Sequence, residues 1–261
     1  MKLNRIYAMV LRYWYYMKHS LDRLSDMFYW PSVDLLLWGL TSKFIENKTG
    51  DTSSILFVII SGILFWIIVW RGQYEITVNF LEELWNNNLI NLFVSPLKLG
   101  EWIISVFIIG IFKMTLSLGF AAILAFFLYK TNILNYGIYM IPFAFLLILT
   151  GWAVGLFITA IIMRFGTKVQ TLAWTAIMLI SPFSAVYYPL STLPKWAQNV
   201  SKFVPTSYVF ENARNLIFKG TVNTQDLFIS FALNIAYLFI AVKFIYYGFA
   251  RAKEKGLKSL Y

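Results

Sequence analysis

Charged side chains inside apolar stretches are the residues of this sequence most able to do chemistry. Asp34 follows Trp30-Pro31 in one apolar run, and Lys113 lies well past Trp102 in another. An isolated charge in the hydrocarbon of a membrane is costly, so each should face protein or water. Asp34 would line a transport path or make a packing contact with a neighbouring helix. Lys113 would pair with an acid, contact a lipid phosphate, or extend its ammonium group toward the interface.

A second group of polar and aromatic residues lies between residues 181 and 214, where four prolines exclude a single long helix. Aromatic side chains mixed with polar groups are typical of the depth of lipid headgroups. We expect outer gate helices at 189–217 that are short, broken and re-entrant, with an ordinary interfacial loop as the alternative. Glu211 and Arg214 share a helix face and would either lock this lid or form a surface pair. The expected gate residues are Pro189, Pro194, Trp196, Pro205, Glu211 and Arg214.

The composition indicates the class of protein. Of 261 residues, 59% are hydrophobic and 13% are charged, about half the charged share usual in soluble proteins. This predicts a single all-α integral membrane domain spanning 1–261. The absence of cysteine excludes disulfides and thiolate-bound metals, and the single histidine, His19, cannot build a histidine-rich metal site. The net charge of +10 is expected from cytoplasmic flanks beside anionic lipid, and not from nucleic-acid binding.

The apolar segments predict six transmembrane helices, each close to the roughly 20 residues that cross the hydrocarbon. Their expected bounds are 27–44, 55–70, 102–129, 136–163, 169–188 and 227–250. Lysine and arginine favour the flanks that place both termini in the cytoplasm. Residues 1–26 form an amphipathic pattern typical of an interfacial helix. Gly151 and Gly155 form a G-x-x-x-G pattern, which predicts close helix packing within one subunit.

The longest inner connection, 71–101, predicts a short amphipathic helix at 79–95. Asn79 would cap this helix, and acids in its first turn would complement the helix dipole. Such a helix offers a docking surface to a soluble partner, although a plain surface helix is the alternative. The expected contact residues are Glu82, Glu83, Leu84, Trp85, Asn86, Asn87 and Asn88.

These features together resemble the permease subunit of a type-2 ABC transporter of the exporter class. The resemblance rests on the N-terminal interfacial helix leading into Trp30-Pro31, the helix followed by Ser95-Pro96-Leu97, the long apolar pair 102–129 and 136–163, and the proline-punctuated outer segment. The likeness covers nearly the whole chain. It implies that 79–95 is the coupling helix of the family and that 189–217 forms its upper lid.

The resemblance also implies the assembly. Such permeases act as pairs, here a homodimer in the cytoplasmic membrane, with two copies of a cytoplasmic ATPase. This chain contains no G-x-x-x-x-G-K-[ST] motif, so ATP and Mg²⁺ would bind to the separate ATPase and no cofactor to this chain. Substrate would pass near the first, second and fifth spans. The expected path residues are Trp30, Asp34, Trp38, Trp174, Tyr187 and Tyr188.

The cargo class stays open among lipids, amphiphilic drugs and lipid-linked glycans. Two other classes of protein remain as alternatives. An ATP-independent transporter or channel would need no ATPase and should show internal repeats. An intramembrane prenyltransferase-like enzyme would use acids such as Asp22 and Asp26, which are four residues apart on one helix face.

Overall fold

The computed structural model describes residues 1–49 and 54–255, and within these ranges every regular element is a helix. The long helices are α2 (Leu21–Thr49), α3 (Ser54–Trp85), α5 (Leu99–Tyr129), α6 (Met140–Phe165) and α10 (Thr224–Lys255). The shorter α-helices are α1 (Leu3–Lys18), α4 (Leu89–Val94), α7 (Leu172–Ile180), α8 (Lys195–Ser201) and α9 (Pro205–Lys219). Four 3₁₀ turns connect them: η1 (Ile133–Tyr139), η2 (Gly166–Val169), η3 (Ser181–Phe183) and η4 (Leu190–Thr192).

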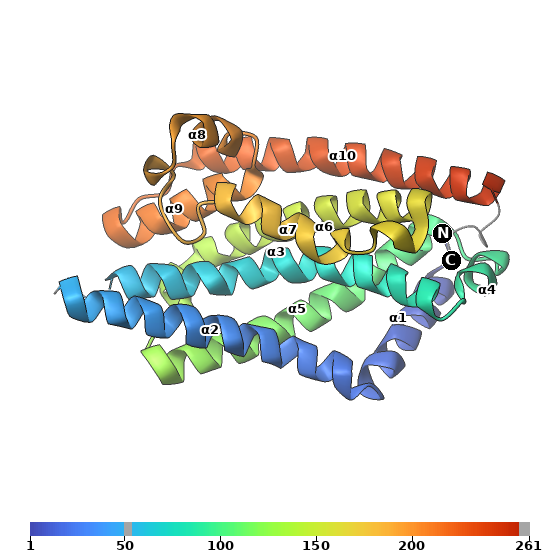
Figure 1. Cartoon of the computed structure of the whole chain (residues 1–261), viewed down its shortest axis with the longest axis horizontal. Coiled ribbons are helices and arrows are strands. Elements are labelled where there is room, and N and C mark those ends of the chain that lie inside the picture. The colour runs from blue at the N-terminus through green and yellow to red at the C-terminus, as the bar shows by residue number, and fades with distance from the viewer. Residues whose placement is uncertain (50–53, 256–261) are drawn as a thin grey trace.

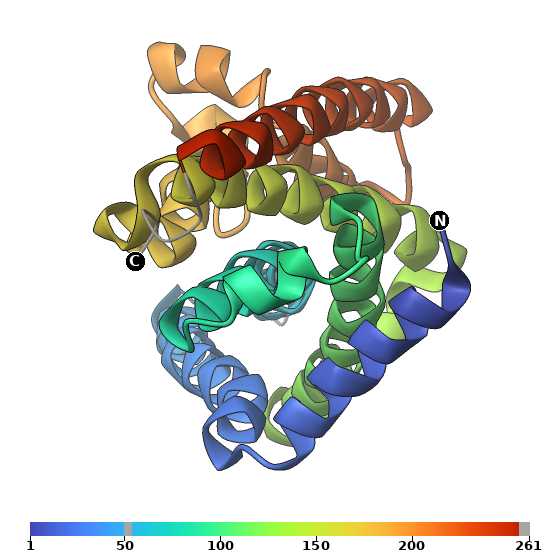
Figure 2. The same ribbon diagram turned by 90° about the vertical axis from the view of Figure 1, so that its right-hand side faces the viewer.

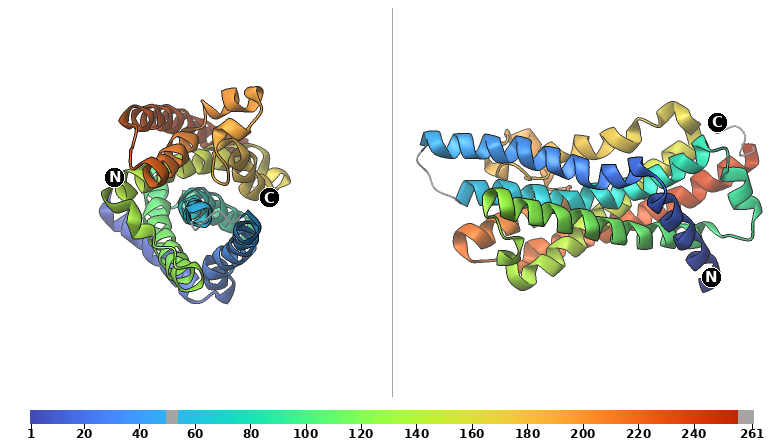
Figure 3. Two further views of the ribbon diagram at one scale, coloured as in Figure 1. Left: turned by 90° about the vertical axis from the view of Figure 1, so that its left-hand side faces the viewer. Right: turned by 90° about the horizontal axis from the view of Figure 1, so that it is seen from below.

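The long helices run along one another as a bundle with two different ends (Figure 1). One end carries α1, α4 and the last turns of α10, and Figure 2 looks directly at it. The opposite end carries α8 and α9, seen in the left view of Figure 3.

Helix α3 is the centre of the bundle. It packs against α2, α5 and α6, and the end views show it surrounded by them (Figure 3). A helix that is apolar on all sides is stable only when it is buried on all sides. Accordingly 78% of the most apolar window of α3 is buried, against 22% for α10, which packs on the outside.

Glycines let α3 and α6 approach closely. A Cβ atom on Gly151 would lie 2.6 Å from the carbonyl oxygen of Val69 and 3.0 Å from Cα of Gly72. A Cβ atom on Gly155 would lie 3.0 Å from the carbonyl oxygen of Gln73. The G-x-x-x-G pattern therefore packs two helices of the same chain, as predicted.

Helix α2 continues through Pro31, which has no N–H to donate to the carbonyl oxygen of Met27. The hydroxyl of Ser117 on α5 donates to that oxygen instead, at 2.8 Å. The hydroxyl of Tyr129 on α5 donates to the carbonyl oxygen of Leu35 at 2.9 Å. Helix α5 thus replaces the hydrogen bond that the proline removes and ties α2 to the bundle.

Within the described residues, four helices are long and apolar enough to cross a membrane: Leu56–Trp85, Leu99–Tyr129, Ile133–Val169 and Thr224–Glu254. The prediction of six equivalent spans is therefore not reproduced. The expected span 27–44 is the middle of α2, where Asp34, proline and aromatic groups dilute the apolar content. The expected span 169–188 is wrong as one helix, because the apolar helix Leu172–Phe183 ends in a 3₁₀ turn containing Pro182, and Ala185 then adopts a positive φ.

Two other boundaries differ from the sequence prediction. The first helix ends at Lys18 and α2 begins at Leu21, so 1–26 is not one element. The predicted helix 79–95 is also wrong: Asn79 is an interior residue of α3, and its side chain donates to the carbonyl oxygen of Glu75. The helix breaks only at 86–88, where Asn87 takes the left-handed conformation that asparagine tolerates.

The outer segment has the broken helices that its prolines predict. Pro189 and Pro194 precede η4 and α8, and Pro205 is the first residue of α9, where a missing N–H costs nothing.

The close approach of α3 and α6 gives a direct test. Gly151→Leu should lower the free energy of unfolding by about 1–3 kcal/mol, because the side chain enters space occupied by the α3 backbone. Gly119→Leu on α5 is the matched control, since a Cβ atom there meets nothing within 4 Å. The measurement is the thermal midpoint of the detergent-purified protein. Equal midpoints for the two variants would contradict this packing.

Candidate functional site

A network of buried charges joins three long helices. Arg71 and Glu75 lie one turn apart on α3 and are 1% and 2% exposed. The guanidinium of Arg71 donates to Oδ2 and to the carbonyl oxygen of Asp26 on α2, each at 2.6 Å. The ammonium of Lys113 on α5 donates to Glu75 Oε2 at 2.6 Å. Of the three possibilities for Lys113, pairing with an acid is the one observed.

The network borders a pocket of about 200 Å³ between α2, α3, α5 and α7. We call it the polar pocket. Glu82 in its wall pairs with Arg23 of α2 at 2.5 Å. The residues that line it are Asp22, Arg23, Asp26, Tyr74, Glu75, Val78, Asn79, Glu82, Trp85, Lys113 and Trp174.

Two tryptophans form part of the wall. The rings of Trp85 and Trp174 are stacked with centroids 6.3 Å apart and an interplanar angle of 10°. The indole N–H of Trp85 donates to Gln170 Oε1 at 2.9 Å. The structure thus brings together Trp85, predicted as an ATPase contact, and Trp174, predicted as a path residue.

Helix α1 is held against both sides of the α3–α4–α5 connection. Arg12 pairs with Glu83 of α3 at 2.8 Å, and the backbone N–H of Lys2 donates to Glu101 Oε1 of α5 at 2.8 Å. The indole N–H of Trp102 donates to the hydroxyl of Tyr13 at 2.8 Å. Burial raises the pKa of Tyr13, so this hydroxyl stays neutral.

The predicted ATPase-contact residues separate into two groups. Glu83 and Leu84 are buried, Glu82 lies in the polar pocket, and the side chain of Asn88 donates to Glu83 Oε2 at 2.6 Å. Trp85, Asn86 and Asn87 are exposed at the end of the bundle. Glu82 and Glu83 are predicted docking groups, yet they bind within the chain because α1 and α2 present arginines to them.

The predicted path residues on α2 lie together. Trp30 and Trp38 are exposed, and Trp38 stacks on Tyr187 with centroids 4.5 Å apart. Asp34 is half-buried one turn before Trp38, and none of the described side chains donates to its carboxylate. The hydroxyl of Tyr188 donates to the carbonyl oxygen of Pro182 at 3.0 Å. Trp174 is separate from this group.

Glu211 and Arg214, the predicted gate pair, bind backbone groups of the segment 185–190. Arg214 donates to Glu211 Oε1 at 2.9 Å and to the carbonyl oxygen of Ala185 at 2.8 Å, and Glu211 accepts the N–H of Leu190 at 2.8 Å. Because Arg214 is buried and both residues hold backbone groups, this is not an isolated surface pair. Trp196 is exposed, and its ring contacts Phe183 edge-on.

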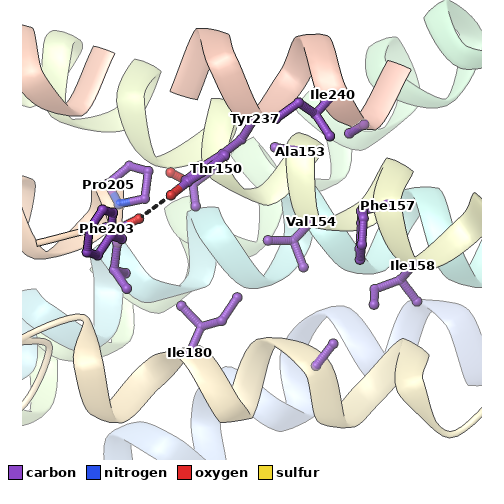
Figure 4. Close-up of a pocket in the computed structure, with 13 residues that line it drawn as sticks. Thr150, Ala153, Val154, Phe157, Ile158, Ile180, Phe203, Pro205, Tyr237 and Ile240 are labelled. Atoms are coloured by element: carbon purple, nitrogen blue, oxygen red, sulfur yellow. Dashed lines mark hydrogen bonds between the residues drawn. The ribbon is translucent and has the colours of Figure 1, made fainter. Parts of the chain in front are cut away.

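A second pocket, of about 420 Å³, is apolar (Figure 4). It lies between α6, α7, α10 and the start of α9. Its polar groups are satisfied within the chain: Thr150 donates to Asn234 Oδ1, and Tyr237 donates to the carbonyl oxygen of Phe203. Such a cavity accepts hydrocarbon and offers nothing to a charge.

The enzyme alternative required acids free to bind a metal. Asp26 instead holds Arg71, so the pair with Asp22 does not form a free metal site. Across the described ranges, no group of three or more histidine, aspartate or glutamate side chains is arranged to hold a metal ion.

Sequence reasoning missed Arg71 and Glu75 as site residues. From the sequence, Arg71 is only the first residue of the inner connection 71–101, and Glu75 has no predicted role. Their signal is two opposite charges four residues apart at the end of an otherwise apolar run.

The network predicts a specific non-additivity. Lys113→Met should lower the free energy of unfolding by about 3 kcal/mol or more, because it leaves Glu75 buried without its closest cation. Adding Glu75→Gln should restore much of this loss, since Arg71 keeps Asp26. Chemical denaturation of the single and double variants measures both effects, and simple addition of the two losses would argue against the pairing.

Comparison with known families agrees with this architecture. The profile described as ABC-2 type transporter matches residues 12–218, which is well over half of the chain. No individual curated protein matches the chain. With its apolar helices, the chain is a multi-pass membrane protein, the transport component of an ABC transporter and not an enzyme in itself. The chain belongs to the ABC-2 type transporter family.

Proposed function

We propose that this permease acts as a homodimer with two copies of a separate ATPase and exports an amphiphilic, lipid-like or lipid-linked substrate across the cytoplasmic membrane. The observation that carries the proposal is the direct connection between the exposed end of the bundle at α4 and the polar pocket. Helix α3 runs without a break from the pocket to the turn before α4.

The ATPase-binding surface consists of Trp85, Asn86, Asn87, Asn91 and Val94. All five are exposed at the end of the bundle that carries α1 and α4 (Figure 2). Helix α4 buries Leu89 and Leu92 toward the bundle and turns Asn91 and Val94 outward. A largely uncharged surface with one large aromatic side chain suits a protein partner, because aromatic anchors carry much of the binding energy at interfaces.

Movement of α4 reaches the pocket through ion pairs. The pair Arg23–Glu82 joins the end of α3 to α2, and the pair Arg12–Glu83 joins it to α1. Because these pairs are short and partly buried, a displacement of the connection displaces α1 and α2 with it. Helix α2 carries Trp30, Asp34 and Trp38, so the same displacement changes the proposed path.

The two pockets support an amphiphilic cargo. The polar pocket holds charges and aromatic rings, while the apolar pocket fits hydrocarbon. Helix α7 separates them: Trp174 lines the polar pocket, and Ala176 and Ile180 line the apolar one. One subunit therefore offers both environments that a head group and a chain require.

The docking surface gives a matched pair of variants. Asn91→Arg with Val94→Asp should reduce co-purification of ATPase activity with the tagged permease about tenfold, since the charges face outward and leave the core intact. Asn199→Arg with Val200→Asp changes the same residue types on α8 at the opposite end and should leave co-purification unchanged. Equal retention in both variants would remove α4 from the interface.

The proposed orientation can be tested by labelling single introduced cysteines, since the chain has no cysteine of its own. Asn199→Cys should react with a membrane-impermeant thiol reagent applied outside cells, because α8 lies at the proposed outer end. Asn86→Cys should react only after the membrane is opened. Both positions are exposed, so access to the side chain is matched. External labelling of Asn86→Cys would contradict this orientation and place α4 outside the cell.

A further inference from the structure

We infer that the polar pocket binds the cationic head group of the transported amphiphile, and that the acidic and aromatic ridge of α2 (Asp22, Asp26, Trp30, Asp34 and Trp38) continues this preference along the path. This inference rests on the proposed function and narrows its substrate class. It excludes anionic head groups as the preferred cargo.

The charge of the pocket is the first argument. Four carboxylates line it, from Asp22, Asp26, Glu75 and Glu82, whereas the cations are Arg23, Lys113 and the adjoining Arg71. When all of these groups are ionised, carboxylates exceed cations by one. A cavity with low-dielectric walls strengthens the effect of such an imbalance on a bound ion.

The pairing of these charges is the second argument. Arg23 binds Glu82, Arg71 binds Asp26, and Lys113 binds Glu75. In the described part of the chain, no side chain bonds to the carboxylate of Asp22 at the edge of the pocket. An anionic ligand would have to break an existing pair, whereas a cation finds Asp22 uncommitted.

One donor atom of Arg23 has no acceptor but is not accessible from the pocket. The Nη1 atom of Arg23 is buried without a hydrogen-bond acceptor, although its guanidinium pairs with Glu82 and lies 4.8 Å from the Tyr16 ring centroid. This atom is enclosed by the protein, so it offers no donor to an anion in the pocket. The charge of Arg23 itself is compensated.

Aromatic walls are the third argument. Trp85, Trp174 and Tyr74 line the same cavity as the carboxylates. Ammonium groups bind favourably against aromatic faces, and tryptophan is the strongest of these. Phosphate and carboxylate groups gain nothing comparable from such a wall.

The surface of α2 repeats this chemistry beyond the pocket. Asp22, Asp26, Trp30, Asp34 and Trp38 follow one another at four-residue spacing and form one ridge of the helix. Asp34 is the second acid of the ridge without a bonded partner among the described residues, and the neighbouring Trp38 stacks on Tyr187. A cation leaving the pocket thus meets a second acid flanked by aromatic rings.

The test is equilibrium binding to the purified permease in lipid nanodiscs, with empty nanodiscs as background. The probes are octyltrimethylammonium, an uncharged analogue with a tert-butyl head of similar shape, and octyl phosphate. We expect octyltrimethylammonium to bind about tenfold more tightly than either other probe. Asp22→Asn should remove most of this preference, and Asp22→Asn with Asp34→Asn should abolish it.

Asp226→Asn is the matched control, because it removes an acid from α10, away from the pocket and the ridge. It should leave the preference unchanged. Equal binding of the three probes, a preference for phosphate, or full ammonium preference in the double variant would each overturn the inference. Co-purification of ATPase activity, measured on the same variants, tests the proposed function separately and should be unaffected by Asp22→Asn.

Discussion

The buried pairing of Glu75 with Lys113 and of Arg71 with Asp26 is the constraint on which this structure depends. Charges at these depths are stable only with their partners in place, so the rotation and depth of α2, α3 and α5 are fixed relative to one another. The polar pocket lies beside these pairs, and charged side chains line much of the space between the helices there. Further along α3, glycines allow the opposite arrangement and bring α6 into backbone contact.

Helix α1, at the end of the bundle that also carries α4, has two different sides. Helix α1 buries Ile6, Met9 and Tyr13 against the chain, while Leu3, Tyr7 and Trp14 remain exposed. The side of α1 that packs on the protein is therefore not its only apolar side. An exposed apolar side is suited to lipid, and the buried side holds α3 and α5 together. Helix α1 therefore contacts the α3–α4–α5 connection on one side and leaves an apolar side free for lipid on the other.

Several features of the fold could be predicted from the sequence, because they depend on composition or on residues close together in the chain. The membrane class, the close packing at Gly151 and the broken helices after Pro189 follow from such local rules. The pairing of Asp26 with Arg71 could not be predicted, since the partners are 45 residues apart and no local pattern joins them. The helix expected at 79–95 was misplaced because Asn79 and the following acids resemble a helix start. In the structure these groups instead bond to Glu75, Arg12 and Arg23.

The hydrogen bond from Ser117 to the carbonyl oxygen of Met27 has a consequence for biosynthesis. Helix α2 is synthesised well before α5, so at first it lacks the donor that compensates for Pro31. It also carries Asp34, and each of these features disfavours a lone helix in hydrocarbon. We therefore expect α2 to pack stably only after α5 has been synthesised, because α5 supplies the hydrogen-bond donor that Pro31 removes.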